Sequence, residues 1–388
     1  MQKRIPAVYM RGGTSKGLIF HSNHLPGDSA ARDRVILAAY GSPDPNRRQI
    51  DGMGGAVSVT SKVAIVSVAE ESACDVVYHF GQVSIDRPLV DYKGTCGNIA
   101  AAVAAFAVDE GLVKVETPVT RVRIFQQNTG KRILADVPVK DGRYEEEGDY
   151  AINGVPGTGG KITLHYLAPG GSVTGKLFPT GNLIDAVDVP GLGTVHMTVI
   201  DVGNPWVLVP AEDLGLAGTE IAEIEQNAKI REHLEAVRGQ AAVAIGLVGT
   251  PIEATQRSQA IPKIGFFAAP QPYQALDGTA ITPADMDLVG RVMTMGTLHK
   301  SMAVSCPMAV AGAAAIEGTT IHRILGPRAP GQATLRVGHP GGIFDVTARV
   351  EKQGAAFELK EAAYGRTARR LMEGYVLVPA RTFEGEPA

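Results

Sequence analysis

Two short apolar segments constrain the fold of this 388-residue chain more than any other feature. They are residues 99–108 (IAAAVAAFAV) and 308–316 (MAVAGAAAI), which are rich in alanine and have no polar face. Each is far too short to cross a bilayer. A helix that is apolar all round must be buried on every side. Each segment is therefore expected to lie at the centre of a core of its own.

The rest of the chain is divided into short runs by 46 glycines and 24 prolines, which favour short strands and tight connections. Strands are predicted at residues 7–10, 18–21, 58–68, 76–85, 121–126, 162–166, 197–201 and 207–209. Helices are predicted at 29–39, 97–110, 221–238, 283–295 and 308–316. Strands outnumber helices and do not alternate with them one for one. The pattern predicts an α+β fold of mixed, mostly antiparallel sheets, each wrapped round a central helix.

A weak internal repeat supports two similar domains. Residues 7–27 and 197–216 each read as an apolar strand, a glycine turn and a second apolar strand. Later in each half a cysteine, Cys96 or Cys306, opens an alanine-rich helix, and a lysine, Lys62 or Lys263, opens an apolar strand upstream. We expect a pseudo-twofold pair, with residues 1–182 plus a C-terminal strand at about 372–388 in one domain and residues 183–371 in the other. The two cysteine-led helix starts would face one cleft.

Composition excludes several classes of function. The net charge is −3, with no basic stripe for nucleic acid and no polybasic arm for a membrane surface. The three cysteines form no CxxC pair, which favours a reducing compartment and a cytoplasmic protein. Neither GxGxxG nor GxxxxGK[ST] occurs, and no His, Cys or carboxylate cluster has metal-ligand spacing. The sequence therefore predicts no cofactor and no metal, and an anion must be bound by a local group of donors.

The segment GTCGN, residues 94–98, is the first such candidate. A buried helix that starts here points the free amides of Gly97 and Asn98 at whatever lies in front of them. The positive end of the helix dipole also stabilises a thiolate at Cys96. The alternative is that Cys96 is a small buried hydrophobic residue.

Lys62 is the second candidate, because TSKVAIV places it where polar residues give way to an apolar strand. Desolvation there favours the neutral amine, which can act as a base. The alternative is a lysine that reaches from the strand end to water. Its neighbour Ser61 is a candidate binding residue.

The third candidate is the turn RGGTSKG, residues 11–17. Arg11 offers a fork for a carboxylate, and Thr14 and Ser15 offer hydroxyl groups. The alternative is a plain hairpin turn with Arg11 in solvent. A lysine, a thiol and an anion-binding helix start together suit proton abstraction next to a carboxylate or conjugated alkene.

Motifs through almost the whole chain resemble the PrpF family of 2-methylaconitate isomerases, within the diaminopimelate-epimerase-like superfamily. They include RGGTSKG (11–17), QIDGMGGA (49–56), TSKVAIVS (60–67), FGQVSIDRPLVDYKGTCGN (80–98), FPTGNLIDAVDVPG (178–191), PKIGF (262–266) and GRTARRLMEGYVLVP (365–379). The resemblance implies two domains with the active site between them and no cofactor. It also implies that Lys62 and Cys96 match the family's catalytic lysine and cysteine. Family relatives include 4-oxalomesaconate tautomerases, methylitaconate isomerases and aconitate isomerases.

Cys306 departs from the family pattern, which does not require a cysteine there, whereas epimerases of the superfamily use a second cysteine at this position. It could mark a two-thiol site or a thiol near the substrate. Pro307 suits the first turn of a helix but removes one amide donor. Lys263 and Ser305 are weaker candidates for substrate binding from the second domain.

These observations predict an isomerase that moves a proton and a double bond on an unsaturated tricarboxylate such as 2-methylaconitate or aconitate. Lys62 is the expected base, and Cys96 returns a proton or stabilises the intermediate; the reverse assignment of the two roles stays open. One rival is a two-cysteine amino-acid epimerase, and another is a non-catalytic accessory of an aconitase-type enzyme. The oligomeric state stays open, with a homodimer among the options.

Overall fold

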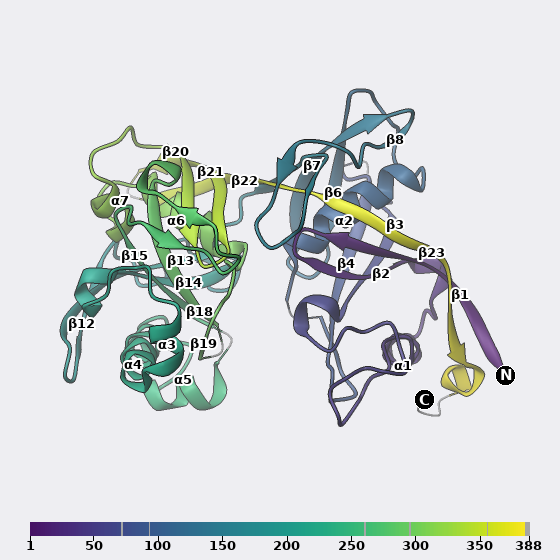
Figure 1. The fold of residues 1–388 in the computed structure, drawn as a ribbon, viewed down its shortest axis with the longest axis horizontal. Coiled ribbons are helices and arrows are strands. Elements are labelled where there is room, and N and C mark those ends of the chain that lie inside the picture. The colour runs from purple at the N-terminus through teal and green to yellow at the C-terminus, as the bar shows by residue number, and fades with distance from the viewer. Residues whose placement is uncertain (71–72, 93, 260, 295, 355, 385–388) are drawn as a thin grey trace. The chain divides into compact units, whose positions relative to one another are not determined.

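The computed structural model describes residues 1–70, 73–92, 94–259, 261–294, 296–354 and 356–384, and it divides into two compact units (Figure 1). Unit 1 comprises residues 1–166 and 365–388, and unit 2 comprises residues 167–364. Within the described residues, no helix combines the length and the apolar character needed to span a bilayer.

Unit 1 is a mixed sheet round one central helix. Strands β1 and β2 form a hairpin, β3 runs parallel to β2, β4 antiparallel to β3, β6 parallel to β4, and β7 antiparallel to β6. The last strand, β23, returns to pair antiparallel with β1. The elements are β1 (Gln2–Gly12), β2 (Ser15–His21), α1 (Ser29–Tyr40), β3 (Lys62–Val68), β4 (Val76–Val83), β5 (Val90–Asp91), α2 (Gly97–Asp109), β6 (Val119–Gln126), β7 (Lys131–Lys140), β8 (Arg143–Tyr144), β9 (Tyr150–Ala151), β10 (Thr158–Gly159), β11 (Ile162–Leu167) and β23 (Ala368–Pro379).

Unit 2 repeats the same order of strand pairings. Strands β13 and β14 form a hairpin, β15 runs parallel to β14, β18 antiparallel to β15, β20 parallel to β18, and β21 antiparallel to β20. The elements are β12 (Asp185–Val189), β13 (Gly193–Val202), β14 (Asn204–Pro210), α3 (Ala222–Gln226), α4 (Ala228–Ala244), α5 (Pro251–Arg257), β15 (Lys263–Ala268), β16 (Tyr273–Gln274), β17 (Ala280–Ile281), β18 (Leu288–Thr294), β19 (Thr297–Leu298), α6 (Ser305–Ala314), α7 (Thr320–Leu325), β20 (Gln332–His339), β21 (Gly342–Gln353) and β22 (Ala356–Arg366). The predicted α+β class is confirmed.

The two alanine-rich segments are the central helices, as their composition predicts. Every residue from 99 to 108 in α2 is at most 3% exposed. Residues 306–314 of α6 are all buried as well. Strands β1, β2, β6 and β7 contact α2, and β13, β20 and β21 contact α6. Alanine lets these strands approach the helix closely, and each helix is enclosed along its length.

The prediction of a helix at 283–295 is wrong. The chain there forms a short 3-10 turn, Pro283–Asp285, followed by strand β18. A single arginine within an apolar run is typical of the polar side of an amphipathic helix. The side chain of Arg291, however, is fully buried. Its guanidinium donates to the carbonyls of Thr219, Glu220 and Gly290, so that the charge is satisfied inside the unit. Its burial lowers its pKa to about 10, although Tyr273, Glu220 and Glu223 act in the opposite direction.

The helix predicted at 221–238 is interrupted. It is two helices, α3 and α4, separated at Asn227, whose side chain accepts a hydrogen bond from the Lys229 amide at 3.0 Å. Asparagine is a preferred N-cap because its side chain satisfies a free amide of the first turn.

Gly17 sets the close approach of β2 to β3. It lies opposite Lys62 in the parallel pair, and a Cβ at this position would stand 1.7 Å from the Lys62 carbonyl oxygen. The Tyr40 hydroxyl donates to that same carbonyl and accepts from the Leu18 amide at 2.8 Å. The glycine therefore lets α1 and two strands meet at one backbone atom of Lys62.

Gly17→Ala is expected to destabilise the protein by about 2–3 kcal/mol, the range of overpacking substitutions, because the overlapping atom belongs to backbone. Urea unfolding followed by circular dichroism measures the change. Gly27→Ala is the matched control, since a Cβ there meets nothing within 4 Å, and should change stability by less than about 0.5 kcal/mol. Equal stability of the two variants would contradict the close-approach argument.

Candidate active site

Lys62 is the first residue of β3 and lies between β2 and β4, opposite Gln82 in the antiparallel pair. Its side chain is half-buried. The Lys62 Nζ donates to Gln82 Oε1 at 2.7 Å and lies 5.1 Å from the centre of the Phe80 ring. A ring face and an amide oxygen are both favourable surroundings for a cation. The ammonium is thus held at the edge of the core.

Ser61, the residue before it, is fully buried. Its hydroxyl donates to the Val83 carbonyl at 3.0 Å and accepts from Gln49 Nε2 at 2.8 Å. Gln49 also donates to the Ser42 hydroxyl at 2.9 Å and accepts from the Ala56 amide at 2.8 Å. The network fixes the QIDGMGGA segment against the start of β3.

Cys96 is the N-cap residue of α2, and its side chain is half-buried. Its carbonyl accepts the helical bond from Ala100 at 3.0 Å and a second bond from the Tyr78 hydroxyl at 3.2 Å. The Cys96 side chain accepts no capping bond. Cys96 therefore stands directly before the free amides of the first turn, the position that the sequence predicts.

One face of β4 links the surroundings of both candidate catalytic residues. Tyr78, Phe80 and Gln82 alternate along the strand, so their side chains share a face. Tyr78 contacts Cys96, whereas Phe80 and Gln82 contact Lys62. At about 3.3 Å per residue, this face extends over roughly 13 Å. It runs from the Cys96 carbonyl to the Lys62 side chain, the two residues for which the sequence predicts a catalytic role.

The RGGTSKG turn packs against the start of α2. Asn98 Nδ2 donates to Thr14 Oγ1 at 3.0 Å, and Asn98 Oδ1 accepts from Arg366 Nε at 2.9 Å. A Cβ on Gly12 would stand 2.2 Å from the Asn98 carbonyl oxygen, and one on Gly13, whose φ is +51°, would stand 2.0 Å from Asn98 Oδ1. The two glycines are therefore required by the close approach of hairpin and helix.

Arg11 is half-buried and directed into this turn. Its Nη1 donates to the carbonyls of Gly13 and Thr367, both at 3.1 Å, and to the Thr367 hydroxyl at 3.0 Å. Burial lowers the pKa of Arg11. Ser15 is buried, at 3% exposure. Arg11 therefore braces the hairpin through these bonds. It is not the solvent-exposed arginine that the plain-turn alternative predicts.

In unit 2, Lys263 and Ser305 begin the strand and the central helix that correspond to β3 and α2 of unit 1. Lys263 opens β15 opposite Trp206, and its Nζ lies 5.7 Å from the centre of the Trp206 ring. Ser305 opens α6, and its Oγ accepts from Asn204 Nδ2 at 3.2 Å and from Trp206 Nε1 at 3.1 Å. As in unit 1, an amide-to-hydroxyl bond ties the central helix to the preceding hairpin.

Cys306 differs from Cys96 in its burial. It is fully buried within α6, and burial raises its pKa well above the ordinary value of a thiol. The thiol is therefore protonated at neutral pH, although Lys263 acts in the opposite direction. A buried, protonated thiol is a poor base.

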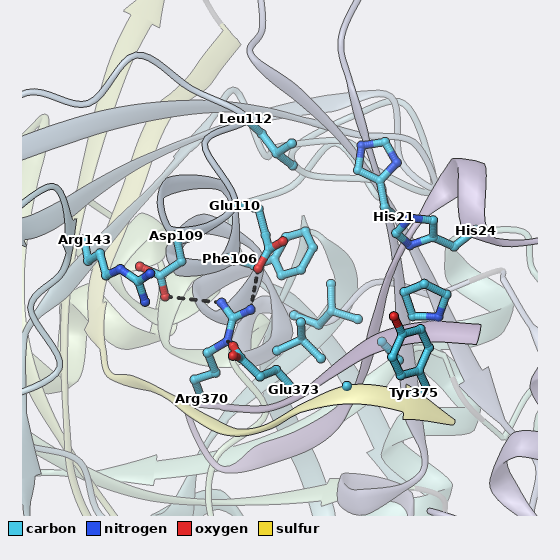
Figure 2. Close-up of a pocket in the computed structure, with 15 residues that line it drawn as sticks. His21, His24, Phe106, Asp109, Glu110, Leu112, Arg143, Arg370, Glu373 and Tyr375 are labelled. Carbon is cyan, nitrogen blue, oxygen red and sulfur yellow. Dashed lines mark hydrogen bonds and ion pairs between the residues drawn. The ribbon is translucent and has the colours of Figure 1, made fainter. Parts of the chain in front are cut away.

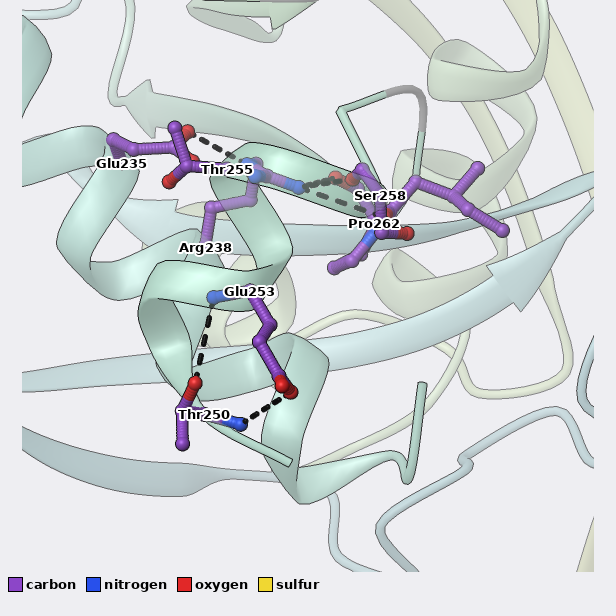
Figure 3. A network of polar contacts seen from close by, with 8 residues as sticks. Glu235, Arg238, Thr250, Glu253, Thr255, Ser258 and Pro262 are labelled. Carbon is purple, nitrogen blue, oxygen red and sulfur yellow. Dashed lines mark hydrogen bonds and ion pairs between the residues drawn. The ribbon is translucent and has the colours of Figure 1, made fainter. Parts of the chain in front are cut away.

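A buried arginine clamps the segment that leads into Lys263. Arg238 donates to both carboxylate oxygens of Glu235 and to the carbonyls of Ser258, Ile261 and Pro262 (Figure 3). In the same region Thr250 caps α5 through a capping box with Glu253. These contacts fix the backbone immediately before β15.

Two cavities in unit 1 lie beside the β1–β2 hairpin or the end of α2. One, of about 440 Å³, is lined by the candidate residues Arg11, Thr14 and Ser15 together with Lys16, Thr60 and Arg369. The other, of about 640 Å³, lies at the C-terminal end of α2, where Arg370 is held by Asp109 and Glu110 (Figure 2). Within the described residues, no group of three or more His, Cys, Asp or Glu is placed to hold a metal ion.

Sequence reasoning missed two residues of the site, Gln82 and Arg366. Both lie within motifs that carry the family resemblance, FGQVSIDRPLVDYKGTCGN and GRTARRLMEGYVLVP. Position within a strand could have indicated Gln82, because it alternates with Phe80 and Tyr78. Arg366 is 268 residues from Asn98 in the chain, and no local pattern relates them.

The chain matches the model of the PrpF protein family over residues 2–379. It belongs to the PrpF family. It is 43% identical to the 3-methylitaconate isomerase of Eubacterium barkeri, over 97% of this chain and 98% of the relative. It is 41% identical to the 2-methyl-aconitate isomerase of Shewanella oneidensis, over the same shares. A crystal structure of methylitaconate-delta-isomerase matches with a TM-score of 0.88 and 41% identity, covering 100% of this chain and 98% of that one. These relatives confirm the prediction of an isomerase.

The burial difference predicts how the cysteines of this PrpF-family isomerase react. At pH 8, iodoacetamide is expected to label Cys96 at least about tenfold faster than Cys306, since only an accessible thiolate reacts readily. Mass spectrometry of tryptic peptides measures both rates in one sample. Protein unfolded in urea is the control, where the two rates should converge. Equal labelling rates in the folded protein would contradict the assigned burial.

Proposed function

We propose that this isomerase catalyses a 1,3-allylic proton shift, which moves the double bond of an unsaturated tricarboxylate such as 2-methylaconitate. A proton leaves one carbon and another is returned two carbons away, so substrate and product have the same composition. No oxidant or reductant is needed to balance the reaction. The names of the relatives, which describe isomerases of unsaturated carboxylic acids, support this substrate class.

The observation that carries the proposal is that one face of β4 contacts both Lys62 and the carbonyl of Cys96. Lys62, held by Gln82 at 2.7 Å, is the base that removes the allylic proton. Cys96, at the start of α2, returns a proton or stabilises the intermediate. Removal of the proton gives a dienolate, whose negative charge is favoured by the amides of Gly97 and Asn98 at the same helix start.

The carboxylates of the substrate require further donors. Thr14 accepts from Asn98, which leaves its own hydroxyl proton to donate. With Arg11 and Ser15 it lines the cavity of about 440 Å³. In our proposal Ser61 contributes through its carbonyl, which holds Gln82 at 2.8 Å, because its hydroxyl is engaged inside the core.

In unit 2, we assign Lys263 and Ser305 to carboxylate binding. Ser305 accepts two hydrogen bonds and retains its proton for donation. The burial of Cys306 opposes the rival two-cysteine epimerase. We further propose a cytoplasmic location, since cysteines without disulfides suit a reducing compartment.

Proton NMR in D₂O tests the proposal. Incubation with 2-methylaconitate should give a new alkene isomer and deuterium at the allylic carbon. Lys62→Ala should lower kcat by about 10³-fold, the range for loss of a general base, whereas Cys306→Ser should stay within about threefold of the native protein. A panel with aconitate, methylitaconate and 4-oxalomesaconate identifies the preferred substrate. Strong loss in Cys306→Ser with little loss in Lys62→Ala would favour the epimerase instead.

A further inference from the structure

We infer that Gln82 is a positioning residue that directs the Lys62 amine toward the substrate, an inference that rests on the proposed role of Lys62 as base. Gln82 stands directly opposite Lys62 in the β3–β4 pair. Its side chain lies on the strand face that also carries Phe80.

The orientation of the Gln82 amide is determined by its partners. Its Nε2 donates to the carbonyls of Ser61 at 2.8 Å and Ser58 at 3.1 Å. Both hydrogens of the amide nitrogen are therefore used, and the oxygen must face the Lys62 Nζ at 2.7 Å. The flipped amide would bring an oxygen against two carbonyl oxygens and an NH₂ group against an ammonium. One arrangement satisfies every partner.

Positioning matters here because lysine is a flexible side chain with a charge at its end. A base must point along the C–H bond that it breaks, and a displacement of about 1 Å can lower a rate about 10²-fold. The Phe80 ring contacts the Lys62 ammonium from one side and Gln82 from another. Together they restrict the amine to one direction.

A neutral amide also suits the proton cycle of a base. Gln82 Oε1 can accept a hydrogen from the ammonium or from the neutral amine. A carboxylate at the same place would favour the ammonium strongly and hold the lysine protonated. Glutamine therefore orients Lys62 in both of its protonation states.

The elements packed against β3 carry other titratable groups. Tyr40 of α1 contacts the Lys62 carbonyl, and Tyr78 of β4 contacts the Cys96 carbonyl. Lys16 of β2 has its ammonium 5.6 Å from the Tyr9 ring centre. Each of these groups is retained when Gln82 is replaced, so a shift in the pH profile reports on Gln82.

Two variants of opposite electrostatic effect test the inference. Gln82→Met removes the acceptor and keeps the length, and kcat should fall about 10–10²-fold with KM changed less than about threefold. Loss of the acceptor disfavours the ammonium, so the pH at which kcat/KM rises should move down by about half a unit to one unit. Gln82→Glu adds a negative charge, and the same rise should move up by about one unit.

Gln126→Met is the matched control. Gln126 is a buried glutamine on neighbouring β6, and its amide bonds Asn128 and Thr129 without contacting Lys62. It should lower thermal stability as Gln82→Met does, but leave the pH at which kcat/KM rises unchanged. Shifts of the same sign in both Gln82 variants, or none, would overturn the positioning role.

A second measurement does not depend on turnover. The rate at which acetic anhydride modifies Lys62, followed by peptide mass spectrometry against pH, reports the neutral amine directly. It should show the same opposite shifts in Gln82→Met and Gln82→Glu. If Lys62→Ala keeps full activity, the proposed base is wrong. If Lys62→Ala is inactive and both Gln82 variants titrate like the native protein, the inference about Gln82 alone fails.

Discussion

The complete burial of α2 is the constraint on which the rest of unit 1 depends. A helix with ten consecutive buried residues, 99–108, has no face for solvent and must be enclosed by strands along its length. Its N-terminal amides then have no partners within the helix. The start of α2 therefore offers free amides of the kind that bind anions, and Cys96 stands directly before them. The position of this candidate site follows from the burial of the helix.

The β1–β2 hairpin closely approaches both the start of α2 and Lys62 at the start of β3. Gly12 and Gly13 let the β1–β2 turn meet Asn98, and four residues later Gly17 lets β2 meet the carbonyl of Lys62. One hairpin thus contacts both the helix start and the lysine-bearing strand. Larger residues at these positions would separate elements that carry the two candidate catalytic groups. The glycines of RGGTSKG are explained by these contacts.

The sequence predicted the elements whose formation depends on residues close together in the chain. Apolar periodicity and alanine content identified α2 and α6, and the order of polar and apolar residues placed Lys62 at a strand start. It failed at Arg291, where distant carbonyls satisfy a buried charge that local spacing cannot reveal. It also missed the bond between Asn98 and Arg366, because the C-terminal strand returns to unit 1 from the far end of the chain. Local sequence patterns do not predict hydrogen bonds between residues that are far apart in the chain.

The two units share one order of strand pairings but differ in what they offer to chemistry. In unit 1 the half-buried Cys96 is the N-cap residue of the central helix, and a glutamine amide contacts the lysine. In unit 2 the thiol of Cys306 is buried and protonated, and the helix start carries a serine hydroxyl instead. Its lysine lies over Trp206. Unit 2 therefore retains groups that can donate to an anion, whereas the proposed base and acid both belong to unit 1. This asymmetry suits a reaction in which one lysine moves the proton, and it does not suit two equivalent thiols acting on opposite faces of one carbon.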